Sequence, residues 1–101
     1  MEVYVEYEGR SMVFWLIGEL DEHSAEFVRR RLDAAISENS FDNIIFDLSR
    51  LSFMDSTGIG VVIGRYKLVR KQGKPVYVRN PSTTVDKIFR MSGLYEIISK
   101  I

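Results

Sequence analysis

The sequence predicts an α/β protein: a mostly parallel central sheet with an antiparallel hairpin strand at its N-terminal edge and helices packed on it. Two observations support this fold class. Strand-like apolar runs alternate with segments of helical period, and glycine, proline or helix-capping residues mark most of the changes. Strand, helix, strand connections are right-handed and place their strands parallel. Since 101 residues suffice for one core, we expect a single domain over residues 1–101.

The first two strands are predicted at Val3–Tyr7 and Met12–Ile17, joined by a turn at Glu8–Arg10. The first alternates apolar and polar residues, which is typical of a strand with one exposed face. The second is apolar on both faces, which indicates a strand covered on both sides. We therefore expect Trp15, in the middle of this strand, to belong to the core.

The segment after Gly18 changes to helical period, with one apolar stripe formed by Val28, Leu32, Ala35 and Ile36. The later predicted elements alternate in type: a strand at Ile44–Leu48, a helix at Gly58–Lys71, a strand at Val76–Arg79, and a helix opened by Asn80–Ser82 and closed by Gly93. Leu94–Ile98 is a candidate for a short final strand.

Composition excludes several classes of function. The chain has 14 basic and 14 acidic residues, so no net charge attracts it to nucleic acid or to an anionic membrane. It has no cysteine and one histidine, His23, which argues against a metal site. The N-terminus carries no signal-peptide pattern, and no apolar run is long enough to span a bilayer. We expect a cytoplasmic protein without a cofactor.

The octapeptide FMDSTGIG, Phe53–Gly60, lies between the third predicted strand and the following helix. Such strand-to-helix turns carry the sites of many open α/β proteins. Asp55, Ser56 and Thr57 are all good helix N-caps, and one cap leaves the other two residues without a structural role. A helix N-terminus also favours negative charge, so a phosphate carried by one of these hydroxyls is well placed there.

The glycines that follow favour packing over nucleotide binding. Gly60 and Gly64 lie one turn apart, and we expect them to allow close contact between helix and sheet. Ile63 occupies the third glycine position of the dinucleotide fingerprint, and no P-loop lysine is present. The G-x-S-x-G elbow of serine hydrolases is absent, and His23 lies at a different helix start. We therefore do not expect an enzyme.

Three segments resemble one known family. LSFMDSTGIGVVIGRYKLVRKQG (Leu51–Gly73), GELD (Gly18–Asp21) and MSGLYEII (Met91–Ile98) are similar to the bacterial anti-sigma-factor antagonists of the STAS-domain family, the SpoIIAA type. The resemblance implies that residues 1–101 form a STAS domain. It implies an unphosphorylated form that binds an anti-sigma factor and frees its sigma factor. It further implies that the anti-sigma factor is also the serine kinase that phosphorylates Ser56, and that a PP2C-type phosphatase reverses this.

The resemblance also implies a set of partner-binding residues: Asp21, Met54, Asp55, Ser56, Thr57 and Gly58. Asp21 has two readings, as the N-cap of the first helix and as a contact to the kinase. Met54 is expected to be an exposed apolar contact, in preference to a buried one. Thr57 stands where the family often has a second serine, so it is a competing hydroxyl beside Ser56.

We expect a monomer that forms complexes with these proteins and binds neither nucleic acid nor membrane. The alternative is a STAS interaction module of another assembly, a stress-signalling scaffold or the accessory subunit of a transporter, without a working phosphoswitch.

Overall fold

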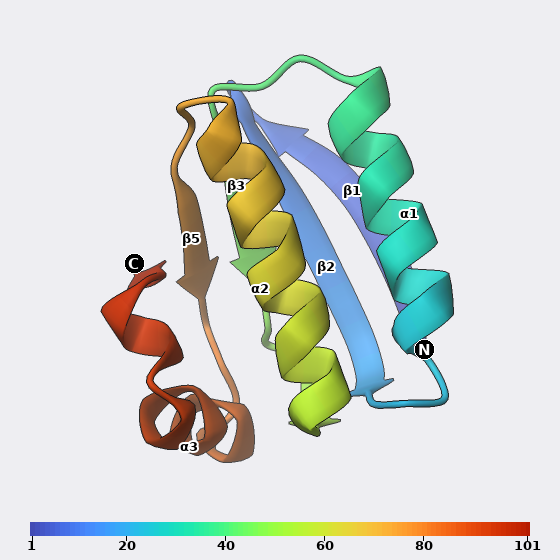
Figure 1. Ribbon diagram of the computed structural model, residues 1–101, viewed down its shortest axis with the longest axis vertical. Coiled ribbons are helices and arrows are strands. Elements are labelled where there is room, and N and C mark those ends of the chain that lie inside the picture. The colour runs from blue at the N-terminus through green and yellow to red at the C-terminus, as the bar shows by residue number, and fades with distance from the viewer.

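The computed structural model describes residues 1–101, and Figure 1 shows two of its helices lying over a twisted sheet and a third near one end of it. The strands are β1 (Glu2–Glu8), β2 (Ser11–Leu20), β3 (Asn43–Asp47), β4 (Leu51–Met54), β5 (Val76–Arg79) and β6 (Ser99–Lys100). The helices are α1 (Ala25–Glu38), α2 (Ser56–Lys71) and α3 (Thr83–Ser92), followed by the short 3₁₀ helix η1 (Leu94–Glu96). No helix is long and apolar enough to cross a membrane.

The sheet has the predicted topology. Its strand order is β1-β2-β3-β5-β6, with β1 antiparallel to β2 and every other pair parallel. β2 changes partner along its length: Ser11–Trp15 pair with β3, and Gly18–Leu20 pair with β4, with a shift in register between Gly18 and Glu19. The end of β2 is therefore bonded to the strand that leads into α2.

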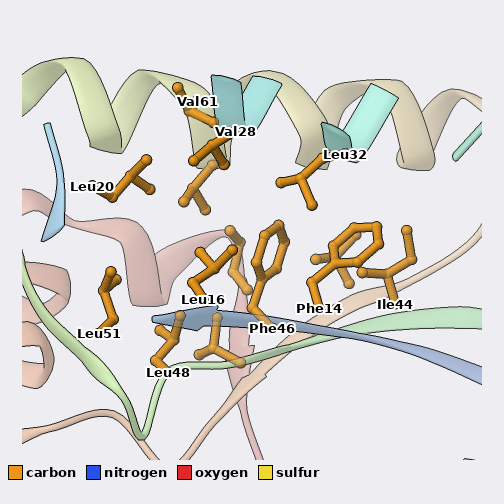
Figure 2. Packing of buried hydrophobic residues seen from close by; sticks show 14 of the residues in the cluster. Phe14, Leu16, Leu20, Val28, Leu32, Ile44, Phe46, Leu48, Leu51 and Val61 are labelled. Carbon is orange, nitrogen blue, oxygen red and sulfur yellow. The ribbon is translucent and has the colours of Figure 1, made fainter. Parts of the chain in front are cut away.

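The core lies between one face of the sheet and the helices α1 and α2, which lie side by side over that face (Figure 1). Figure 2 shows Phe14, Leu16 and Phe46 of the sheet pointing toward the helices. The helical side contributes the predicted stripe of α1, all of it buried: Val28, Leu32, Ala35 and Ile36. The burial of these apolar side chains is the main force that holds α1 and α2 against the sheet.

The opposite face of the sheet is closed in part by an ion cluster. The Arg79 guanidinium bonds to the buried Asp47 at 2.8 Å and to Glu8 at 2.7 Å, and lies 5.4 Å from the ring centroid of Trp15. The hydrogen bonds that Arg79 donates to the carboxylates of Glu8 and Asp47 raise the pKa of the guanidinium. Trp15 alternates with Phe14 and Leu16, so it faces this side and is only partly buried. The prediction that it belongs to the main core is wrong.

Two predicted boundaries differ from the structure. The octapeptide 53–60 is not a single turn: Phe53 and Met54 end strand β4, and α2 begins at Ser56 instead of Gly58. Leu94–Ile98 contains the 3₁₀ helix η1, and the last strand follows it at Ser99–Lys100. The four-residue β4 was missed because it follows β3 after only three residues, too closely for a separate apolar run to stand out.

Candidate functional site

Asp55 is the N-cap of α2. Its Oδ1 accepts a hydrogen bond from the backbone N–H of Gly58 at 2.9 Å, and its carbonyl accepts the first helical bond from Ile59, also at 2.9 Å. A carboxylate in this position satisfies one of the unpaired first-turn amides and complements the positive end of the helix dipole. Of the three cap candidates in the sequence, the structure selects Asp55, which leaves both neighbouring hydroxyls uncommitted.

The second oxygen of the same carboxylate reaches a distant segment. Asp55 Oδ2 accepts a hydrogen bond from the backbone N–H of Glu22 at 3.1 Å, and the Asp55 N–H donates to the carbonyl of Leu20 at 3.3 Å. Leu20 is the last residue of β2 and Glu22 lies in the connection between β2 and α1, both more than thirty residues earlier in the chain. This connection and the start of α2 therefore form one continuous surface at the end of the sheet.

Asp21 organises the turn that precedes α1. Its Oδ1 accepts from the N–H groups of His23 at 3.0 Å and Ser24 at 3.1 Å. Burial alone would raise the pKa of Asp21, but the bonds from Ser24 and His23 outweigh it and lower that pKa. α1 itself begins at Ala25, and its N-cap residue Ser24 makes no side-chain capping bond. The expectation that Asp21 is the N-cap of α1 is therefore wrong: its carboxylate, which is partly exposed, stabilises the turn before the helix instead.

Gly58 is the glycine that close packing requires. A Cβ at this position would lie 2.1 Å from the carbonyl oxygen of Leu20, a distance that no side chain could adopt. Gly60 and Gly64 have no neighbouring atom within 4 Å of such a Cβ, so the prediction that they pack against the sheet is wrong. Gly58 is buried, and it brings the first turn of α2 onto the end of β2.

Four hydroxyl side chains lie around this end of the sheet, and two of them are engaged. Ser24 Oγ donates to the carbonyl of Glu19 at 2.8 Å, and Ser52 Oγ donates to that of Gly18 at 3.0 Å. Ser56 and Thr57 are exposed and make no side-chain hydrogen bond, and their backbone N–H groups have no partner either. The structure therefore leaves two hydroxyls free for chemistry, both in the first turn of α2.

Met54 does not have the predicted exposure. Its side chain is 2% exposed and packs in the main core, because β4 directs it inward toward the helices. The expectation of an exposed Met54 contact is therefore wrong. The neighbouring Phe53 is 44% exposed instead. It lines a shallow hollow of about 650 Å³ whose other walls come from α3: Thr83, Thr84, Lys87, Ile88, Met91 and Ser92.

Sequence reasoning missed this hollow. Ile88 and Met91 are three residues apart, a spacing that puts them on one face of a helix, and this signal was present in the sequence. Phe53 carried no such signal, because its exposure follows from the pairing of β4 with β2. No group of three or more His, Cys, Asp or Glu side chains lies close enough together to hold a metal ion.

Fold and site together define a small α/β interaction module with a free serine at a helix N-terminus. The STAS-domain family model matches residues 3–101, and the chain belongs to that family. The anti-sigma F factor antagonist of Paenibacillus polymyxa is 36% identical over 98 residues, which span 97% of this chain and 84% of that protein. The resemblance found in the sequence is confirmed.

Two solved structures extend the comparison. The anti-sigma factor antagonist SpoIIAA in its unphosphorylated form superposes with a TM-score of 0.82 at 37% identity, covering 99% of this chain and 88% of that one. The Bacillus cell fate determinant SpoIIAA in the phosphorylated form gives 0.74 at 36% identity, covering 99% and 91%. The chain thus shares its fold with a protein whose structure is known in both phosphorylation forms.

Proposed function

We propose that this chain is an anti-sigma-factor antagonist that works by partner switching. Its unphosphorylated form binds an anti-sigma factor with serine kinase activity and thereby releases a sigma factor. Phosphorylation of Ser56 by that kinase ends the binding, and a PP2C-type phosphatase restores it. The chain acts as a monomer in the cytoplasm, and it is the substrate of the kinase and not itself a catalyst.

The observation that carries this proposal is the environment of the Ser56 hydroxyl. It is exposed, it makes no hydrogen bond, and it belongs to the first residue of α2. A kinase can reach such a group without unfolding the chain. Thr57 shares these properties, and Ser56 is preferred because it directly follows the motif aspartate, as the phosphorylated serine does in the family that the sequence resembles.

The same environment accommodates the product. A phosphate brings about 1.5 to 2 negative charges at neutral pH. The N–H groups of Ser56 and Thr57 are unpartnered, and the helix dipole favours negative charge at this end. The domain itself is therefore expected to tolerate phosphorylation. The free-energy cost falls on binding of the partner, which must bring its own surface against the new charge.

The surface offered to the partner combines polar and apolar parts. Asp21, Asp55, Ser56 and Thr57 form its polar centre, and Phe53 with the α3 hollow adds an apolar flank. Apolar contact next to a few charged groups is the usual composition of a protein interface. A curated relative of 36% identity is named as an antagonist, which favours this function over a scaffold or transporter module without a phosphoswitch.

Intact-mass spectrometry tests the proposal directly. Wild type, Ser56→Ala and Thr57→Ala are incubated with ATP and the anti-sigma kinase encoded nearest to this chain's gene. We expect one added phosphate on wild type and on Thr57→Ala, and none on Ser56→Ala. Equal labelling of all three would assign the acceptor elsewhere. Absence of labelling in all three would remove the phosphoswitch.

A further inference from the structure

Phe27 on α1 is an exposed aromatic residue that the fold does not use. It lies outside the buried stripe of its helix, and its side chain is 53% exposed. An exposed Phe in the first turn of a helix gains nothing from solvent, and aromatic side chains are enriched among the residues that form protein interfaces. We infer that Phe27 anchors the anti-sigma factor on α1, so that the partner surface extends from Ser56 across the first turns of this helix.

The first argument is continuity with the proposed partner surface. Phe27 lines a shallow hollow of about 590 Å³ together with Asp21, His23 and residues at the end of β2. Asp21 precedes Glu22, whose N–H is bonded to Asp55 beside the phosphorylation site. Asp21 therefore joins the hollow beside Phe27 to the surface around Ser56.

The second argument is the shape on the other side of Phe27. A further hollow of about 510 Å³ runs along α1 and is lined by Glu26, Phe27, Arg30, Arg31 and Ala34. Phe27 is thus a ridge with a hollow on each side. Aromatic side chains that enter a pocket of the partner while the surrounding contacts exclude water are the residues that dominate binding energies.

The third argument is charge. Arg29 and Arg30 both pair with Glu26, Arg30 at 2.8 Å, whereas Arg31 makes no ion pair. Three arginines and one glutamate give residues 26–31 of α1 a net charge of +2. On the other side of Phe27 lie the carboxylates of Glu19 and Asp21. The complementary partner surface has an apolar pocket between an acidic and a basic region, and this order of charges sets its orientation.

Binding measurements test this inference, which rests on the proposed function. The probe is the purified anti-sigma kinase encoded nearest to this chain's gene, with ADP in place of ATP so that no phosphate is transferred. The variants are Phe27→Ala, Arg31→Glu, Ser56→Glu and the control Leu68→Ala. Leu68 is 40% exposed, on the later turns of α2. Circular dichroism establishes that each variant is folded.

We expect Phe27→Ala to weaken binding about tenfold or more and Arg31→Glu to weaken it severalfold, while Leu68→Ala binds like wild type. If Ser56→Glu loses binding and Phe27→Ala keeps it, the proposed function stands and the Phe27 anchor is overturned. If wild type does not bind, the proposed function itself fails. A wild type that sediments as a dimer and a Phe27→Ala that sediments as a monomer would assign the ridge to self-association and also overturn the inference.

Discussion

The carboxylate of Asp55 accepts a hydrogen bond from the backbone N–H of Glu22 at 3.1 Å, and this bond ties the β2–α1 connection to the first turn of α2. The other oxygen of the carboxylate caps α2 through Gly58. One side chain therefore sets the relative position of the Asp21 turn and the Ser56 hydroxyl. A partner that recognises both segments depends on Asp55 even where it does not touch that residue.

Substitutions at Asp55 separate its two roles. Asparagine can still cap α2 with its amide oxygen, but its NH₂ group then faces the N–H of Glu22, so the hydrogen bond between these two residues is lost. We expect Asp55→Asn to lower the free energy of unfolding by about 1 kcal/mol and Asp55→Ala by about 2 kcal/mol, because alanine loses the cap as well. Urea unfolding measures both values. Equal costs for the two variants would contradict the separate roles.

Gly58 and Gly60 form a matched pair. Gly58→Ala places a Cβ against the carbonyl oxygen of Leu20, so α2 must move away from β2. We expect a loss of about 3 kcal/mol in the free energy of unfolding. Gly60→Ala meets no atom within 4 Å and removes a glycine from a helix interior, so a gain of up to about 1 kcal/mol is expected. Thermal unfolding distinguishes the two variants. A Gly60→Ala variant less stable than wild type would refute the conclusion that a side chain at position 60 meets no neighbour.

Phosphorylation of Ser56 is expected to act locally. A doubly charged group ~8 Å from a partner carboxylate, at an effective dielectric constant of ~40, costs about 2 kcal/mol, or roughly thirtyfold in affinity. No rearrangement of the sheet is needed. Backbone NMR spectra before and after phosphorylation test this: amide shifts confined to residues 21–24 and 53–60 are expected. Shifts spread through the core strands would indicate a conformational switch instead.

Asp86 ties the last three elements together. Its carboxylate accepts from the Tyr95 hydroxyl, from Lys100 Nζ at 3.0 Å and from Arg90. The Tyr95 and Lys100 bonds lower the pKa of Asp86 to about 2. Since this lies below the ordinary value of 3.8, the stability that ionised Asp86 contributes is fully present above about pH 4, and it is lost as the pH falls through about 2.

Asp86→Asn measures this contribution. We expect the variant to be less stable than wild type at pH 7, and the difference in free energy of unfolding to shrink between pH 4 and pH 2. Urea unfolding at several pH values gives the curve, and Gly60→Ala, which removes no titrating group, serves as the control with a constant difference. A constant difference for Asp86→Asn down to pH 2 would show that its pKa is not lowered.

Local pattern was sufficient for most of the fold. The α1 stripe from Val28 to Ile36 is predictable from its 3.6-residue period, and β3 and β5 from apolar runs bounded by turn residues. Ser82 caps α3 and Gly93 ends it in the left-handed conformation, as a helix-stop signal of this kind predicts. These features depend on neighbours within about one turn of the chain, so a single sequence contains the information.

One feature of the site follows from the local sequence, and the others follow from the tertiary structure. The placing of Asp55, Ser56 and Thr57 at a helix start follows from the sequence, because capping is local. The pairing of β4 with the end of β2 decides the rest: which residue caps α2, whether Met54 is buried, and which glycine lies against a carbonyl oxygen. That pairing joins segments about thirty residues apart, and only the folded chain brings the Leu20 carbonyl and the Glu22 amide to the first turn of α2.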